Sequence, residues 1–230
     1  MTAFRIAALV AATLATGLIA GVFYAYANSV MPALNRTDDR AMVDVMQKIN
    51  VVIINPWFMI GFLGTVGFTA LAAALHLGKD HRTVLIWVAV ALALNVIAFA
   101  VTSGLNVPLN DQLAAAGDPA SIGDLAKIRA DFESAWVRWN IVRAVLHTVA
   151  FLVLCGALFV AGMRHGRVAA DAEVNSPSFA RHGAAAVTAG GGPAVAGQPQ
   201  RHYLTHYQTR HAPRGGQFPG QFGGPGYRRA

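Results

Sequence analysis

The chain has 230 residues, of which 55% are hydrophobic and only 13% are charged, and its mean hydropathy is +0.45. A soluble domain carries about twice this share of charged residues, and it could not bury so much apolar surface while presenting a charged exterior. The composition therefore excludes an ordinary soluble domain and indicates an integral membrane protein surrounded by a lipid bilayer. The single cysteine, Cys155, excludes an intramolecular disulfide, a CxxC redox pair and a cysteine-rich zinc site.

Four apolar runs are long enough to cross a bilayer: residues 6–27, 56–77, 83–103 and 141–162. About 20 residues of α-helix span a hydrocarbon core of about 30 Å. The runs must be helical because lipid cannot hydrogen-bond to exposed backbone groups. The first run could also be a signal peptide, but its 22 residues exceed the apolar region of about 7–15 residues in a cleavable leader. We therefore expect a membrane span there.

Two amphipathic helices are expected outside the membrane. Asp38 or Asp39 can cap the first of them, which has an apolar face at helical spacing. That face consists of Met42, Val45, Met46 and Ile49. The Gly, Pro and Asn content of residues 104–120 predicts a loop. From Ser121 a second amphipathic helix runs into the fourth span without a helix breaker, so residues 122–162 are predicted to form one long helix.

The expected fold is all-α: a four-transmembrane-helix antiparallel bundle with two amphipathic segments and a disordered tail. Residues 1–164 form the transmembrane domain, and residues 165–230 form the tail, in which 18 of 66 residues are Gly or Pro. The tail contains most of the formal net charge of +7. Its arginines and aromatics favour a solvated end over a specific nucleic-acid site, and its histidines have no scaffold that would hold a metal.

Basic residues set the expected orientation. If the N-terminus is cytoplasmic, eleven lysines and arginines lie on that side and six lie on the other, and the positive-inside rule favours this arrangement. Both termini are therefore expected in the cytoplasm, with the protein in the plasma membrane of a bacterium. The sequence does not indicate an oligomeric state.

Unusual polar and aromatic residues collect at one membrane face, where the first and third spans end and the second and fourth begin. They include Tyr24, Asn28, Asn55, Trp57, Asn106, Asn110, Trp136, Trp139, Asn140 and Arg143. Trp136, Asn140, Arg143 and His147 are four, three and four residues apart, so they share one helix face. Ionisable residues in a membrane normally face the bundle interior, which predicts a pocket with an aromatic rim, asparagine dipoles and one buried cation. Asn95 lies at a depth comparable with His147 and is placed to hydrogen-bond with it.

Each of these residues also has a purely structural interpretation. Asparagines at helix ends are commonly caps, aromatic residues at this level form an interfacial belt, and a polar network can simply hold the helices together. Bis-histidine haem is disfavoured because His76 and His147 differ by roughly 20 Å along the membrane normal. No GxGxxG, Walker, HExxH or GxSxG motif occurs, so neither a cofactor nor a metal is expected.

Four motifs occur in order along the chain: Gly21-Val22-Phe23-Tyr24 through Asn28-Ser29-Val30-Met31-Pro32, Asn50 with Asn55-Pro56-Trp57-Phe58, Asn106-Val107-Pro108-Leu109-Asn110, and Arg138-Trp139-Asn140 with Arg143. Their order and spacing resemble the anthrone oxygenase-like family of small four-span membrane proteins. The resemblance covers about residues 5–162. A few fungal members act on polyketides, so the resemblance implies oxidation of a hydrophobic aromatic small molecule by O₂ without metal or flavin.

This chemistry requires an aromatic slot, a base, and a cation or dipoles where an oxyanion develops. The hypothesis assigns oxyanion stabilisation to Arg143, hydrogen bonding to asparagines and ring packing to aromatic residues. His147 is the best base by intrinsic pKa. The hydrogen-bond donors are Asn140, Asn106 and Asn55, and the aromatic residues are Tyr24, Trp57, Trp136 and Trp139. Arg143, His147 and Asn140 form the expected catalytic set, and Asn28 and Asn110 complete the expected substrate-binding set. The alternative is a non-enzymatic membrane scaffold or lipophile-binding protein, in which the same network only locks the bundle.

Overall fold

The computed structural model describes residues 2–174, and within that range the regular structure is entirely helical. The expected tail lies outside the described residues from position 175 onward. The elements in chain order are α1 (Thr2–Ala25), η1 (Tyr26–Val30), α2 (Met31–Leu34), α3 (Asp39–Val52), α4 (Pro56–Leu75), η2 (Lys79–His81), α5 (Arg82–Val101), η3 (Thr102–Asn106), α6 (Val107–Ala115) and α7 (Leu125–Val174). Here η1 and η3 are π-helical turns and η2 is a 3₁₀ turn.

Four stretches of helix are long and apolar enough to cross a membrane, as predicted. They are Thr2–Leu34, Pro56–Leu75, Lys79–Ala115 and Leu125–Val168. Three of them are longer than the roughly 20 residues that a hydrocarbon core requires. The bundle of an integral membrane protein therefore continues beyond the lipid at one end.

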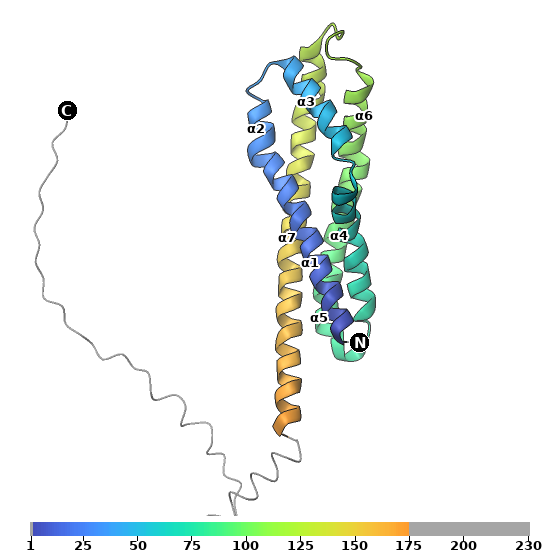
Figure 1. Ribbon diagram of the computed structural model, residues 1–230, viewed down its shortest axis with the longest axis vertical. Coiled ribbons are helices and arrows are strands. Elements are labelled where there is room, and N and C mark those ends of the chain that lie inside the picture. The colour runs from blue at the N-terminus through green and yellow to red at the C-terminus, as the bar shows by residue number, and fades with distance from the viewer. Residues whose placement is uncertain (1, 175–230) are drawn as a thin grey trace, which may run out of the picture. The chain divides into compact units, whose positions relative to one another are not determined.

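The four spans form an antiparallel bundle in which α1 packs against α4 and α7, and α5 packs against the same two helices (Figure 1). Each helix thus has neighbours that run in the opposite direction. Small residues occupy the centre, where Ala12, Ala91 and Ala150 are fully buried together with Leu154. Membrane helices associate through such close packing because apolar lipid tails give no hydrophobic driving force for helix association.

Two glycines mark the closest helix contacts. A Cβ atom on Gly17 of α1 would lie 2.8 Å from the ring of Phe151 on α7, and one on Gly156 of α7 would lie 2.7 Å from the ring of Trp87 on α5. Each aromatic ring packs directly against the glycine of the neighbouring helix. The register of α7 between α1 and α5 therefore depends on these two positions.

Outside the membrane, α2, α3, α6 and the first part of α7 form a cap with its own apolar core. The amphipathic segments are where the sequence placed them: Asp38 accepts a hydrogen bond from the Ala41 backbone N–H and so caps α3. The buried residues of this core are Met31, Leu34, Met42, Val43, Met46, Leu113, Phe132 and Trp136. The apolar face of α3 therefore packs on the apolar stripe of α7.

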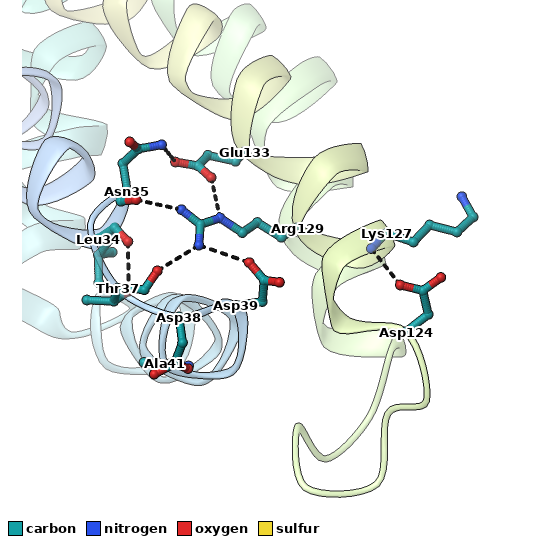
Figure 2. Close-up of polar contacts among 10 residues, drawn as sticks. All are labelled: Leu34, Asn35, Thr37, Asp38, Asp39, Ala41, Asp124, Lys127, Arg129 and Glu133. Carbon is teal, nitrogen blue, oxygen red and sulfur yellow. Dashed lines mark hydrogen bonds and ion pairs between the residues drawn. The ribbon is translucent and has the colours of Figure 1, made fainter.

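Within the cap, Arg129 of α7 binds the turn between α2 and α3 (Figure 2). Its guanidinium donates hydrogen bonds to the backbone carbonyls of Asn35 and Thr37 and forms ion pairs with Asp39 and Glu133, at 3.0 and 2.7 Å. Glu133 also accepts from the Asn35 amide at 2.9 Å. One side chain of α7 thus holds the whole turn between α2 and α3.

Three boundaries differ from the sequence-based prediction. The expected loop at residues 104–120 is mostly helical, because the π turn η3 leads into α6 and Pro108 fits the first turn of a helix. The helix expected from Ser121 begins at Leu125, where the Asp124 side chain accepts from the Lys127 backbone N–H. At its other end α7 continues to Val174, so residues 165–174 are helical.

The two π turns share the same hydrogen bond and are both followed by a proline. The Met31 N–H donates to the carbonyl of Tyr26, and the Val107 N–H donates to that of Thr102, each across five residues. A proline follows directly, at position 32 in the first case and at position 108 in the second. Proline lacks an N–H, and a wide turn of this kind is common beside functional sites.

Replacing Gly17 with alanine tests the contact between α1 and α7. We expect Gly17→Ala to lower the free energy of unfolding by about 1–3 kcal/mol, because the new Cβ overpacks the Phe151 ring. Thermal unfolding in detergent measures the effect. Gly21→Ala is the matched control on the same helix, because a Cβ there meets nothing within 4 Å, and it should gain up to about 1 kcal/mol from helix propensity. Equal melting temperatures for the two variants would contradict the assigned register.

Candidate functional site

The bundle contains two tiers of buried polar side chains between its helices. The outer tier lies beside the π turns and consists of Asn106, Asn140 and Arg143, which are 1%, 0% and 5% exposed. The inner tier lies deeper in the bundle and is centred on Asn95 and His147, both 0% exposed. The sequence predicted these positions to face inward, and the structure brings them to the interior.

Arg143 occupies the centre of the outer tier between two aromatic rings. Its guanidinium carbon lies 4.1 Å from the centroid of the Phe23 ring and 5.5 Å from that of Trp136. Nη2 donates to Oδ1 of Asn140 at 3.0 Å. Among residues 2–174 no carboxylate forms an ion pair with it. A buried cation without a counter-ion is costly unless something else compensates it.

Asparagine side chains of this tier connect neighbouring helices. The Asn140 amide donates to the carbonyl of Phe23 at 3.0 Å, which ties α7 to α1. The Asn106 amide donates to the carbonyl of Trp136 at 3.2 Å, and the Trp136 indole N–H donates to Asn110 at 2.8 Å. The end of the third span is therefore fixed to α7 at the last residue of η3 and again within α6.

The inner tier joins all four spans through the Asn95 amide. Its Nδ2 donates to the carbonyl of Thr65 at 3.0 Å and to the hydroxyls of Thr16 and Thr69 at 3.2 Å. Its Oδ1 lies 3.0 Å from Nδ1 of His147. These four residues besides Asn95 come from α1, α4 and α7, so a single side chain of α5 contacts every other span.

This arrangement fixes the tautomer of His147. A backbone carbonyl can only accept a hydrogen bond, so the Asn95 nitrogen must face Thr65 and its oxygen must face the imidazole. Nδ1 of His147 then carries the proton and donates it to Asn95. The lone pair is left on Nε2, which is the nitrogen that can accept a proton.

Four buried polar atoms have no hydrogen-bond partner among the described residues. They are Nδ2 of Asn50, Oδ1 of Asn106, Nε of Arg143 and Nε2 of His147. Leaving such a group unsatisfied costs about 1–3 kcal/mol, and polar groups in native interiors rarely go without a partner. The Phe23 ring contacts both Arg143 and the His147 ring, whose centroid is 5.5 Å away. The open donor of Arg143 and the open basic nitrogen of His147 thus belong to side chains that share the Phe23 ring.

Three predicted site residues lie on the outside of the bundle. Tyr24 is 62% exposed and Trp57 is 86% exposed, and Asn28 is exposed as well. The interior of this segment is occupied by Phe23, which is buried, and Tyr26 beside it is half-buried. Aromatic residues exposed at this level suit the membrane interface.

The remaining predicted residues lie at the edge of the outer tier. Asn55 is the N-cap of α4, because its Oδ1 accepts from the Phe58 N–H at 3.1 Å while its amide donates to two carbonyls of the preceding turn. Asn110 and Trp139 are half-buried. Asn55 therefore has a structural partner for both of its polar atoms.

The site also contains residues that the sequence argument did not assign to it. Phe23 supplies the ring over the guanidinium, the Tyr26 ring lies 5.8 Å from that of Trp136, and Asn50 supplies an unpartnered amide. The signal for Phe23 was its spacing from buried positions of α1 at intervals of three and four residues, namely Ala12, Thr16 and Ile19. The contribution of Asn50 depends on the fold of the cap and had no such signal.

Two hollows of about 460 and 470 Å³ lie away from this cluster. One is in the cap beside Arg129 and Glu133, and the other is at the N-terminal end of the bundle beside Arg5 and His76. Arg143 lines neither of them. The space around its guanidinium is occupied by the rings of Phe23 and Trp136.

Comparison with known proteins identifies one family. The model of the family described as anthrone oxygenase matches residues 55–153, which confirms the resemblance to an anthrone oxygenase-like family. The match includes α4, α5, α6 and the first part of α7, with Asn95, Asn106, Arg143 and His147. No curated protein matches the chain, and no solved structure matches it.

The hydrogen bonds of Asn95 to the other three spans, which we call the Asn95 junction, can be tested by removing the amide. We expect Asn95→Leu to lower the melting temperature in detergent, with a loss of about 1–3 kcal/mol, because the variant leaves the His147 N–H and the Thr16 hydroxyl without a partner. Asn28→Leu makes the same change at an exposed position with no hydrogen bond to a described residue and should keep the wild-type melting temperature. A similar melting temperature for both variants would show that the junction does not stabilise the bundle.

Proposed function

Because the chain matches the anthrone oxygenase family through its second, third and fourth spans, we propose that it oxidises a planar, hydrophobic anthrone-like substrate with O₂ to a quinone. The reaction takes place at the cluster of Arg143, Asn106 and His147 and uses no cofactor. One observation carries the proposal: each of these three side chains has a buried polar atom without a partner. A substrate with a carbonyl oxygen, a hydroxyl group and an acidic C–H bond would complete all three.

The reaction balances without a metal or flavin. An anthrone has a CH₂ group opposite its carbonyl, and loss of one proton from that carbon gives an electron-rich anthrolate. The anthrolate transfers an electron to O₂, and recombination forms a C–O bond to a peroxide. Loss of the second C–H proton with cleavage of the O–O bond then gives the quinone carbonyl and one water. O₂ is the oxidant, and the substrate carbon is oxidised.

Each side chain has a role that follows from its open atom. Nε2 of His147 accepts the C–H proton, because Asn95 holds the imidazole with its proton on Nδ1. The Arg143 guanidinium stabilises the anthrolate oxygen, and low-dielectric surroundings strengthen that interaction. Oδ1 of Asn106 accepts a hydrogen bond from a substrate hydroxyl, while Asn140 holds the guanidinium in place.

The substrate enters this cluster from the bilayer. A flat apolar molecule partitions into lipid, and the rings of Phe23 and Trp136 occupy the faces of the guanidinium where such a molecule would stack. Binding therefore requires one ring to move aside. The π turns η1 and η3 lie next to these residues, and such turns often mark places where a helix adjusts.

A second candidate function is supported by the same contacts. The amides of Asn106 and Asn140 both donate to backbone carbonyls of a neighbouring helix, which is the arrangement of an interhelical lock. In this alternative the protein is a non-enzymatic scaffold or a lipophile-binding protein. Removing the lock would then lower stability without affecting any reaction.

Turnover of emodin anthrone by the purified protein tests the proposal. We expect quinone formation above the rate in buffer under air and none without O₂. His147→Gln should lower the rate by about 10²–10⁴-fold, because glutamine can still donate to Asn95 but is not a base. Arg143→Met should lower it by about 10²–10³-fold through loss of oxyanion stabilisation. The readout is quinone absorbance, with melting temperatures measured in parallel.

Arg138→Gln is the matched control, because Arg138 lies on the same helix and its side chain is exposed. Its turnover should equal that of the wild type. Quinone formation by wild type no faster than in buffer, or unchanged in Arg143→Met, would remove the enzymatic function for this substrate. Lower melting temperatures in Arg143→Met and Asn106→Ala, without wild-type turnover, would support the scaffold.

A further inference from the structure

A second cluster of cations surrounds a cavity at the opposite end of the bundle from the cap. The cavity measures about 470 Å³ and lies between the start of α1, the turn that joins α4 to α5, and the later part of α7. Figure 1 shows the N-terminal end of α1 beside that turn. None of the residues proposed for catalysis lines it.

The lining carries an excess of positive charge. Three arginines, Arg5, Arg164 and Arg167, face a single carboxylate, that of Asp80. Three histidines line it as well: His76, His81 and His165. With the histidines neutral, the formal charge of the lining is three minus one, or +2, and its positive field favours an anion.

Two of the arginines, Arg5 and Arg164, are held by neutral groups and not by carboxylates. Nε of Arg5 donates to the carbonyl of Leu75 at 2.7 Å. Arg164 donates to the carbonyl of Asp80 at 2.7 Å and to the hydroxyl of Thr83 at 2.6 Å. Within residues 2–174 neither arginine forms an ion pair. Their positions are therefore fixed while their charges remain available to a ligand.

His76 contributes a buried polar group to the same cavity. It is 3% exposed, and its Nδ1 lies 2.7 Å from the carbonyl of Ala72, so that nitrogen carries a proton. Nε2 then has a lone pair that can accept a hydrogen bond from a hydroxyl. The His81 ring stands edge-on to it, with centroids 5.7 Å apart.

The rest of the lining is apolar and continuous with the lipid-facing surface. Leu9 and Val84 are buried beneath the cations, and Ile6 and Val168 line the cavity while 43% and 67% exposed. A free phosphate ion needs polar contacts on all sides, whereas a lipid has an anionic head and apolar chains. The mixture of arginines and aliphatic walls at the end of a membrane span suits the lipid.

We propose that this cavity binds the headgroup of an anionic phospholipid. Arg5, Arg164 and Arg167 contact the phosphate, and Nε2 of His76 accepts from a headgroup hydroxyl such as those of phosphatidylglycerol. The acyl chains lie along Ile6 and Val168. This site is separate from the cluster around Arg143, and its test does not require turnover.

Lipid binding to the full chain in detergent tests the proposal, with phosphatidylglycerol titrated against phosphatidylcholine and followed by native mass spectrometry. We expect tighter binding of phosphatidylglycerol, weakened at higher salt. The double variant Arg5→Gln/Arg167→Gln should bind it about tenfold or more weakly. Arg82→Gln is the matched control, because Arg82 is exposed at the same end of the bundle but does not line the cavity, and it should bind as the wild type does.

Three results would overturn the proposal. One is equal binding of the two lipids by the wild type, and another is an equal loss of binding in Arg82→Gln, which would indicate only a diffuse surface charge. The third is displacement of phosphatidylglycerol by millimolar inorganic phosphate, which would identify a site for a soluble anion. Unchanged melting temperatures, together with rescue by Arg5→Lys/Arg167→Lys, would show that the loss arises from charge and not from misfolding.

Discussion

Inside a bilayer no water is present to hydrogen-bond with a polar side chain, and Asn95 joins polar groups of all four spans within the protein. Its amide contacts threonines of α1 and α4 and the imidazole of α7. A rotation of any one span would leave several of these groups unpaired in a medium without water. The junction thus sets the rotation of each helix, and the positions of Asn106, Asn140 and Arg143 nearer the cap follow from it.

The two tiers differ in how completely they are satisfied. In the inner tier the Asn95 amide uses both of its polar atoms, and only Nε2 of His147 stays open. In the outer tier Arg143 has one hydrogen bond, two aromatic rings and no counter-ion among residues 2–174. A network that only held the helices together would gain by closing every group. The open atoms of Asn106 and Arg143 lie in the outer tier beside the π turns, and that of Asn50 lies in α3.

Much of this architecture could be predicted from the sequence, because helix length and hydrophobicity are local properties. The four spans, the N-cap of α3 by Asp38 and the inward positions of Asn140, Arg143 and His147 all follow from residue type and spacing. The outward positions of Tyr24 and Trp57 could not be obtained in this way, since a residue at the membrane boundary can face either the interior or the lipid interface. The helical character of residues 107–115 was missed because proline and asparagine signal both loops and helix starts.

The wide turns η1 and η3 have a mechanical consequence. Both border Trp136: the Tyr26 ring contacts its indole, and Asn106 donates to its backbone. The cap is therefore connected to the bundle by two helical segments that each contain a π turn, α1–α2 and α5–α6, and by the continuous helix α7. Since π turns are places where a helix departs from regular geometry, a change in the angle between cap and bundle would be taken up at η1 and η3 and not within α7, which continues through both parts.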